Sequence, residues 1–165
     1  MRIELIQPFI NATDAVLAEM LQGPAGVSQV VMEEEVYRRK GVAAKVAFHG
    51  DIEGRVIFDV ERDTARRMAT SLGQAISDPI EQTASETICE LANMVVGNAV
   101  TLLNDQGHRF KVVPPEVHTA EEGYASGCES EAVVMCFQTP SGRIYLNIAL
   151  DYSSQHSAFL AETRV

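Results

Sequence analysis

Residues 78–104 read DPIEQTASETICELANMVVGNAVTLLN, and they carry the longest helical pattern in the chain. Asp78 suits the cap of a helix, and Pro79 suits its first turn because proline has no N–H to leave unpaired. The pattern continues to about Asn104, after which Asp-Gln-Gly ends it. We therefore expect one long helix over about residues 79–104. Its apolar residues fall on an arc of about 100°, a normal core-facing stripe: Ile80, Ala84, Ile88, Leu91, Val95, Ala99 and Leu102.

The opposite side of this predicted helix is polar. Within an arc of about 60° it presents Glu86, Glu90, Asn93 and Gly97. Two carboxylates and a carboxamide thus form one line, followed one turn later by a position without a side chain, where another molecule can approach closely. Any amphipathic helix has a polar outer face, so the spacing alone does not assign a function. Two glutamates four residues apart repel one another slightly in a helix, which favours a reason beyond solvation.

Two carboxylates on one helix also suggest a glycosidase or a metal site. A glycosidase needs its acid pair in a cleft, and an exposed helix face offers none. A metal site would need further oxygen or imidazole ligands. The histidines are scattered singly in the sequence: His49, His108, His118 and His156. We therefore predict no metal site.

Two shorter helices are expected elsewhere in the chain. Residues 11–22 have helical spacing, and Pro8 ahead of them suits a first turn. A second helix is predicted over residues 64–72. Asp63 is expected to cap its start, and Gly73 to end it.

Apolar residues in alternation indicate an antiparallel sheet. The clearest hairpin joins residues 42–48 to residues 56–60 through residues 50–54, whose two glycines permit a tight turn. A second hairpin joins residues 132–138 to residues 143–150 through Thr-Pro-Ser-Gly. Two further β runs are expected, at residues 27–37 and 110–113. Residues 118–130 are rich in Gly and Glu and are expected to form a loop.

Length and composition are those of one globular domain. The chain has 165 residues, of which 46% are apolar and 22% charged. Neither a repeat nor a linker interrupts it. We therefore expect a single α+β domain over residues 1–165, in which an antiparallel sheet packs against two or three helices.

The charge and the cysteines exclude several classes of function. Against 23 Asp and Glu the chain has 13 Lys and Arg, a net charge of −10, so it would repel a nucleic-acid backbone. Neither a signal peptide nor an apolar run of membrane-spanning length is evident. Cys89, Cys128 and Cys136 form no CxxC pair and are expected to stay reduced. We expect a soluble, cytoplasmic protein that binds neither nucleic acid nor membrane.

The segment from Glu86 to Ala99, Glu-x3-Glu-Leu-Ala-Asn-Met-Val-Val-Gly-Asn-Ala, resembles the signature helix of the CheC/CheX/FliY chemotaxis phosphatases. The usual motif is Asp or Ser, three residues, Glu, two residues, Asn, and a proline about two dozen residues later. Gln-Pro-Phe at residues 7–9, residues 50–57 and the closing hairpin also look CheX-like. A single motif copy in a short chain fits CheX, since CheC usually carries two and FliY adds a further domain.

The chain departs from the family motif at two points. Glu86 stands where the family has Asp or Ser, which leaves its role open. Pro114 and Pro115 come slightly early, and Glu116 occupies the expected position of the later proline. Neither departure affects Glu90 or Asn93.

The resemblance implies that the protein hydrolyses the aspartyl phosphate of a CheY-like response regulator. Asn93 would orient the attacking water, and Glu90 would pair with a lysine of the regulator; these two form the expected catalytic pair. Glu86 would extend the contact, and Gly97 would let the partner's backbone approach. Mg²⁺ would be supplied by the phosphorylated regulator, so no cofactor of the protein's own is expected.

CheX relatives pair through their sheets, so a homodimer is expected too. The closing hairpin, residues 132–150, is a plausible participant, with Val133, Met135 and Phe137 on one face. Two alternatives stay open. The chain could be a non-catalytic CheX-like binding module in two-component or flagellar signalling, or an acidic scaffold that has no regulator partner.

Overall fold

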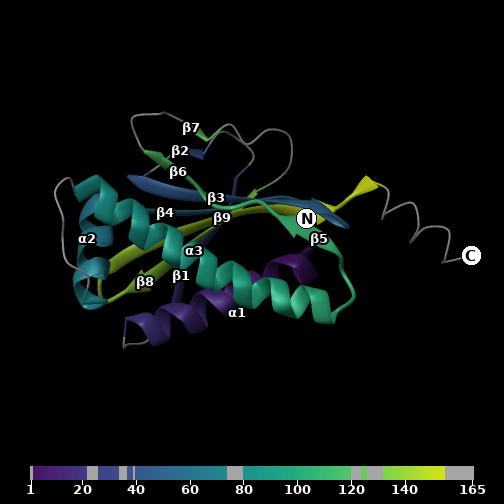
Figure 1. The fold of residues 1–165 in the computed structure, drawn as a ribbon, viewed down its shortest axis with the longest axis horizontal. Coiled ribbons are helices and arrows are strands. Elements are labelled where there is room, and N and C mark those ends of the chain that lie inside the picture. Colours follow the sequence, from purple (N-terminus) through teal and green to yellow (C-terminus); the bar gives the residue numbers. More distant parts are fainter. Residues whose placement is uncertain are drawn as a thin grey trace, which may run out of the picture.

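The computed structural model describes residues 2–21, 26–33, 37–38, 40–73, 80–119, 124–125 and 132–154. Figure 1 shows how the elements of this part of the chain are arranged. In chain order they are α1 (Ile3–Met20), β1 (Gly26–Glu33), β2 (Tyr37–Arg38), β3 (Val42–Gly50), β4 (Ile52–Val60), α2 (Arg62–Ser71), α3 (Ile80–Asp105), β5 (Phe110–Val112), β6 (Glu116–Thr119), β7 (Tyr124–Ala125), β8 (Ala132–Thr139) and β9 (Gly142–Tyr152).

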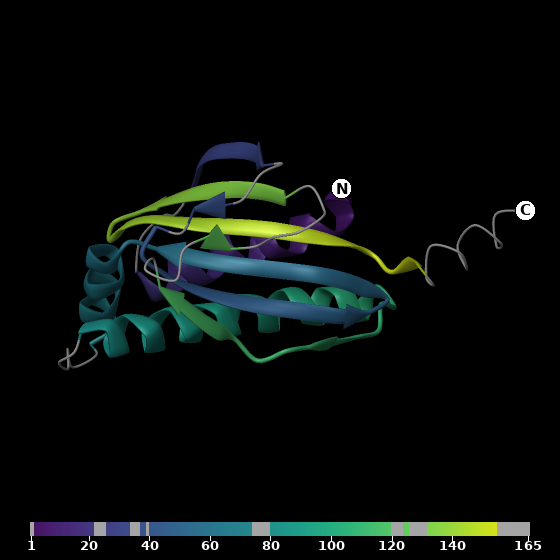
Figure 2. The ribbon, with the colours of Figure 1, turned by 90° about the horizontal axis from the view of Figure 1, so that it is seen from above.

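The strands form an antiparallel sheet, as the sequence predicted. In the described part of the chain, six strands follow the order β1-β8-β9-β4-β3-β5 and a seventh, β6, also pairs with β3, while β2 and β7 form a separate two-stranded sheet. The two predicted hairpins, β3–β4 and β8–β9, are both present and are joined to each other by β4–β9 pairing. Figure 2 shows these long strands side by side. The loop predicted over residues 118–130 was wrong at two places. Strand β6 extends to Thr119 through its pairing with β3, and β7 lies inside the predicted loop, where it pairs with β2.

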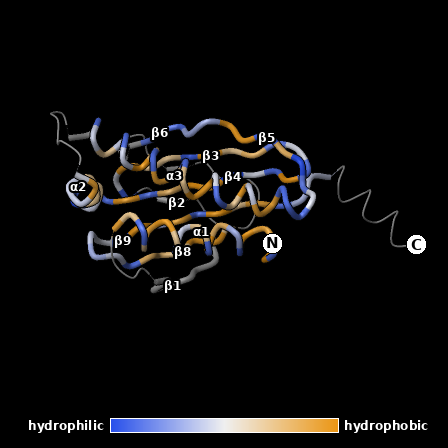
Figure 3. The backbone as a smooth tube through the Cα atoms, turned by 60° about the horizontal axis from the view of Figure 1, so that its bottom comes forward, coloured by the Kyte–Doolittle hydropathy of each residue, from blue (hydrophilic) through white to orange (hydrophobic). Residues whose placement is uncertain are grey.

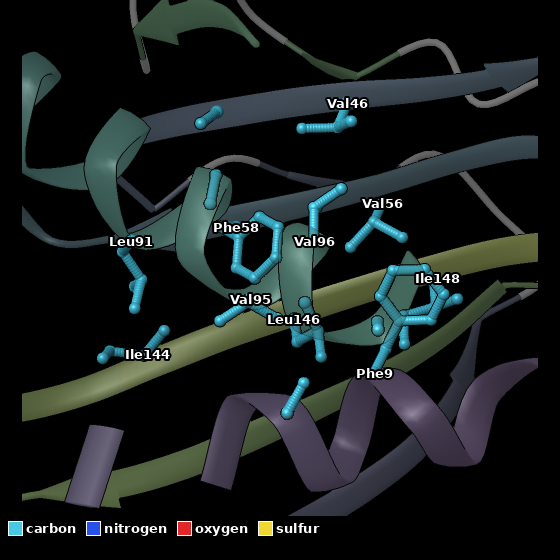
Figure 4. Packing of buried hydrophobic residues seen from close by; sticks show 14 of the residues in the cluster. Phe9, Val46, Val56, Phe58, Leu91, Val95, Val96, Ile144, Leu146 and Ile148 are labelled. Atoms are coloured by element: carbon cyan, nitrogen blue, oxygen red, sulfur yellow. The ribbon is translucent and has the colours of Figure 1, made fainter. Parts of the chain in front are cut away.

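Among the described residues, three helices pack with the sheet, which confirms the predicted α+β class. Figure 1 shows α1 and α3 along one face, with α2 at the end where α3 begins. In Figure 4, Phe9 of α1 and Val95 of α3 lie with Phe58 of β4 and Leu146 of β9 in the core between the layers. In Figure 3, helices and strands both carry hydrophobic stretches interrupted by hydrophilic ones, as expected of elements with one buried face.

The first hairpin turns more tightly than the sequence indicated. Gly50 has a φ of 144° and Gly54 a φ of 132°, both in the region that favours glycine. Gly54, however, lies inside β4, where an added Cβ would collide with the carbonyl oxygen of Ala149 on β9. The turn itself is pinned by Asp51, whose carboxylate accepts the Arg109 N–H at 2.8 Å. This bond ties the hairpin to the segment between α3 and β5.

Helix α1 begins earlier than predicted. It starts at Ile3, so Pro8 lies inside the helix and not in its first turn. A proline there removes one backbone hydrogen bond. Burial outweighs that loss, because Leu5 and Phe9 in the same turns are completely buried.

Helix α2 begins two residues earlier than predicted. Glu61 takes the cap position, and Asp63, the predicted cap, lies in the first turn. In that position its negative charge still interacts favourably with the positive N-terminal end of the helix dipole. Gly73 follows the helix with a φ of 71°, so the predicted glycine stop is confirmed.

Helix α3 matches the predicted long helix closely. It runs from Ile80 to Asp105, while Asp78 and Pro79 lie outside the described residues. One member of the predicted stripe was wrong: Leu102 is 45% exposed, and Leu103 is completely buried in its place. Because α3 packs against both the sheet and α1, its buried arc is wider than a single stripe and also includes Ala92, Val96 and Leu103.

The closing hairpin is not available for pairing as the sequence suggested. Val133, Met135 and Phe137 are buried in the protein's own core beneath the helices. Strand β8 is also flanked on both sides, by β1 and by β9. The prediction that this hairpin face joins two copies was therefore wrong.

The centre of the sheet is buried on its outer face too. Strand β4 is buried from Val56 to Val60, on both sides of the strand. On the outer side Asp59 accepts the Lys40 N–H at 2.8 Å, and Asn147 accepts a bond from Arg55 at 2.7 Å. These hydrogen bonds satisfy buried polar groups that would otherwise destabilise the fold.

Candidate functional site

The four predicted site residues lie together on the solvent-facing side of α3. Glu86, Glu90, Asn93 and Gly97 are all exposed. We call this line of residues the α3 ridge. The residues on the opposite side of the helix are almost completely buried: Ala84, Ile88, Leu91, Val95 and Ala99. Core packing therefore fixes which side of α3 faces outward.

The ridge begins where α2 stops covering α3. Thr83 and Thr87 lie on the outward side of the helical wheel, yet they are only 4% and 1% exposed. Figures 1 and 2 both place α2 beside this end of α3. Thr87 satisfies its buried hydroxyl by donating to the Thr83 carbonyl at 2.8 Å. Beyond this covered end, the outward side of α3 is open to a partner.

Local hydrogen bonds shape the two ends of the ridge. Gln82 donates to the Glu86 carboxylate at 3.1 Å, and Thr101 donates to the Gly97 carbonyl at 2.9 Å. Between these ends, the Asn93 carboxamide makes no hydrogen bond to any described residue. It can therefore offer its NH₂ donor and its C=O acceptor to a molecule outside the protein.

Gly97 is not required by the fold. An added Cβ there would meet nothing within 4 Å, and the residue lies in regular helix. Glycine inside a helix is about 1 kcal/mol less favourable than alanine. The glycine thus lowers stability without any compensating contact in the described part of the chain.

The electrostatics of α3 are uniformly acidic. Between Ile80 and Asp105 the helix contains four acidic residues and neither lysine, arginine nor histidine. Its outer face therefore favours a cationic group on a partner. Among the described residues, His, Cys, Asp and Glu side chains nowhere form a group of three that could hold a metal ion.

Cys89 adds no nucleophile beside the ridge. It is partly buried, and burial raises the pKa of its thiol. The thiol is therefore protonated at neutral pH and poorly reactive. Cys136 is buried, and Cys128 lies outside the described residues.

The residues at the later motif positions lie on the edge of the sheet. Pro114 and Pro115 separate β5 from β6, and both of these strands pair with β3. Glu116, at the position expected for proline, begins β6 opposite Lys45. Prolines at a strand interruption on an edge discourage further strand addition.

None of the described helices is long and apolar enough to cross a membrane.

The fold and the ridge define a CheC/CheX-like protein. A family model described as "Chemotaxis phosphatase CheX" matches residues 42–139, which include the whole of α3. The chain belongs to the CheX family. No curated protein matches it.

Solved structures agree with this assignment. The chain is similar to the CheX–CheY–BeF3–Mg²⁺ complex from Borrelia burgdorferi, with 31% identity over 90% of this chain and 99% of that chain and a TM-score of 0.71. A CheC-like superfamily protein from Shewanella sp. PV-4 has a TM-score of 0.77 at 20% identity, covering 92% and 99% of the two chains. CheX from Desulfovibrio desulfuricans has a TM-score of 0.74 at 22% identity, covering 90% and 99%.

Replacing Gly97 with alanine is expected to stabilise the protein. Gly97→Ala should raise the free energy of unfolding by about 0.5–1 kcal/mol, because helix propensity improves and no atom is displaced. Urea unfolding of the purified variant measures this change. Gly54→Ala is the matched control and should lose stability, since its Cβ collides with β9. A Gly97→Ala protein less stable than wild type would show that the fold itself needs this glycine.

Proposed function

We propose that this protein hydrolyses the aspartyl phosphate of a CheY-like response regulator, in chemotaxis or a related two-component pathway. The observation that carries the proposal is the exposed pair of Glu90 and Asn93 on α3, in a chain of the CheX family. The Borrelia burgdorferi complex of CheX with CheY, BeF3 and Mg²⁺ supports a regulator as partner. There BeF3 stands in for the phosphoryl group. Such a regulator acts in the cytoplasm, so we place the protein there too.

Asn93 supplies what the phosphorylated regulator lacks. In this reaction a water oxygen attacks phosphorus, the bond from phosphorus to the aspartyl oxygen breaks, and inorganic phosphate leaves. Such a transfer depends mainly on positioning and electrostatics, and the regulator brings both the phosphoryl group and its Mg²⁺. The protein therefore needs no cofactor of its own. A carboxamide can hold the water through both of its polar groups and adds no negative charge beside the phosphate.

Glu90 fixes how α3 sits on the regulator. It lies one turn before Asn93 on the same side of the helix. A carboxylate would be repelled by the phosphoryl group, so Glu90 pairs with a lysine of the regulator. Glu86, held by Gln82, extends this contact at the rim. The open space over Gly97 lets the regulator's backbone approach the helix.

Loss of the Asn93 carboxamide is expected to slow hydrolysis and leave docking intact. Asn93→Ala should reduce phosphate release on the order of 10²-fold, a typical effect of one preorganised polar group. Binding of the beryllofluoride-activated regulator should stay within about twofold, because the interaction with water forms only during the reaction.

Asn104→Ala is the matched control for this variant. Asn104 is an exposed carboxamide on the same helix, about 16 Å further along its axis. Its replacement should leave the rate unchanged. Undiminished phosphate release by a folded Asn93→Ala protein would contradict the mechanism. That result would mean that another group positions the water. A wild-type protein that binds the regulator without releasing phosphate would instead be a non-catalytic binding module.

Loss of the Glu90 carboxylate is expected to weaken docking in a salt-dependent way. Glu90→Ala should raise the dissociation constant for the activated regulator about tenfold at low salt. The difference from wild type should shrink at high salt, where the ion pair is already screened. Titrations at two ionic strengths measure both effects. Asp105→Ala, which removes an exposed acid from the end of the same helix, should not reproduce them.

We further propose that two copies of the protein pair through an edge of the sheet. The sheet has two edges, β1 on one side and β5–β6 on the other, and Pro114 and Pro115 discourage strand addition at the second. Edge strands present unpaired backbone groups, which a second copy can satisfy. Light scattering at micromolar concentration should give twice the chain mass of 18.0 kDa. A mass of one chain would contradict this pairing.

A further inference from the structure

Met94 is an apolar side chain that α3 turns toward solvent. It is 37% exposed, whereas Leu91 and Val95 on the same helix are completely buried. The large apolar side chains exposed in the described part of the chain are Ile3, Met94, Leu102, Val112 and Val113. Met94 is the member of this set that adjoins the α3 ridge. More than a third of its surface therefore stays accessible to a partner.

The helix places Met94 beside the line of residues that a partner of Asn93 would contact. The two residues are consecutive, so their side chains project about 100° apart at almost the same height. Glu90 lies one turn before Met94, and Gly97 lies nearly one turn after it. Around the helix axis, both residues lie between the directions of the Asn93 and Met94 side chains. A partner that receives the Asn93 carboxamide over this line therefore also lies over the Met94 thioether.

The surroundings of Met94 are those of an interface anchor. Glu90, Asn93 and Asn98 surround it with exposed polar groups, and the missing side chain at Gly97 leaves open space beside it. An apolar contact enclosed by a polar rim is the usual anatomy of a binding surface. Methionine is unbranched and polarizable, so it adapts to irregular partner surfaces.

We propose that Met94 packs against an apolar surface of the receiver domain beside its phosphorylated aspartate, and that this contact sets how tightly the regulator is held. The inference rests on the proposed function. The occupant is the receiver domain because Met94 is continuous with the surface that presents Asn93. Asn93 acts on the water and Met94 acts on affinity, although they are neighbours in the sequence.

The test separates affinity from turnover. Met94→Ala and the isosteric polar variant Met94→Gln should each raise KM for a phosphorylated CheY-type regulator about fivefold, with kcat within twofold of wild type. The dissociation constant for the beryllofluoride-activated regulator should rise by the same factor. Met94→Leu, which keeps the apolar area, should stay within twofold.

Leu102→Ala is the matched control. Leu102 is an exposed apolar residue on the same helix, about 12 Å further along its axis, and its replacement should leave KM and kcat within twofold of wild type. Circular dichroism and urea unfolding check that every variant is folded. Met94→Gln removes the apolar contact without shortening the side chain, so it tests the proposal even where Met94→Ala proves unstable.

The outcomes distinguish this inference from the proposed function. If wild type releases phosphate and Met94→Gln matches it in KM, the anchor is wrong and the phosphatase assignment stands. A loss confined to kcat would also overturn the anchor, because it would place Met94 in the chemistry. A wild type that neither binds the regulator nor releases phosphate would overturn both.

Discussion

The structure depends on the burial of one side of α3 against the sheet and the neighbouring α1. Residues such as Ile88, Leu91 and Val95 are almost fully removed from water, and each such side chain contributes about 1.5–3 kcal/mol of hydrophobic stabilisation. A rotation of α3 would exchange these side chains for Glu90 and Asn93, and burying a carboxylate and a carboxamide in an apolar core would be strongly unfavourable. The hydrophobic core therefore sets the orientation of the site, although none of its residues belongs to the site.

The opposite face of the helix is free of this constraint, and its composition departs from what stability alone favours. Glu86 and Glu90 stand four residues apart on a helix without a single cation, and Gly97 weakens the helix where an alanine would fit. Met94 exposes an apolar side chain in the same region. The spacing of the glutamates and the glycine are unfavourable for an isolated helix, and the exposed methionine leaves apolar area in water. Together they describe a surface shaped for a partner, with a charge, a carboxamide, an apolar contact and an open approach within about three turns.

The sheet gives this helix a rigid base. Strand β4 is buried on both faces from Val56 to Val60. It belongs to the first hairpin and pairs with β9 of the second, so it couples β3, on which α3 packs, to β9. Gly54 permits the close contact of β4 with β9, and Asp51 ties the first hairpin to the segment that follows α3. The exit of α3 is thus held by the same strands that its apolar side covers. A helix supported in this way holds Asn93 in a fixed position, as the proposed mechanism requires.

The sequence by itself determined what depends on local periodicity. The 3.6-residue pattern of residues 78–104 was enough to predict α3 and to place Glu86, Glu90, Asn93 and Gly97 on its outer face, and alternation was enough to predict both hairpins. What required contacts between distant segments came only from the tertiary structure. Burial of Leu5 and Phe9 carried α1 through Pro8, and packing against two layers buried Leu103 in place of Leu102. Pairing with β3 made a strand of residues expected to lie in a loop, and the helices covered the hairpin face that seemed free for a second copy. Period and turn chemistry act over a few residues, whereas the choice of which face is buried depends on neighbours that the local sequence does not specify.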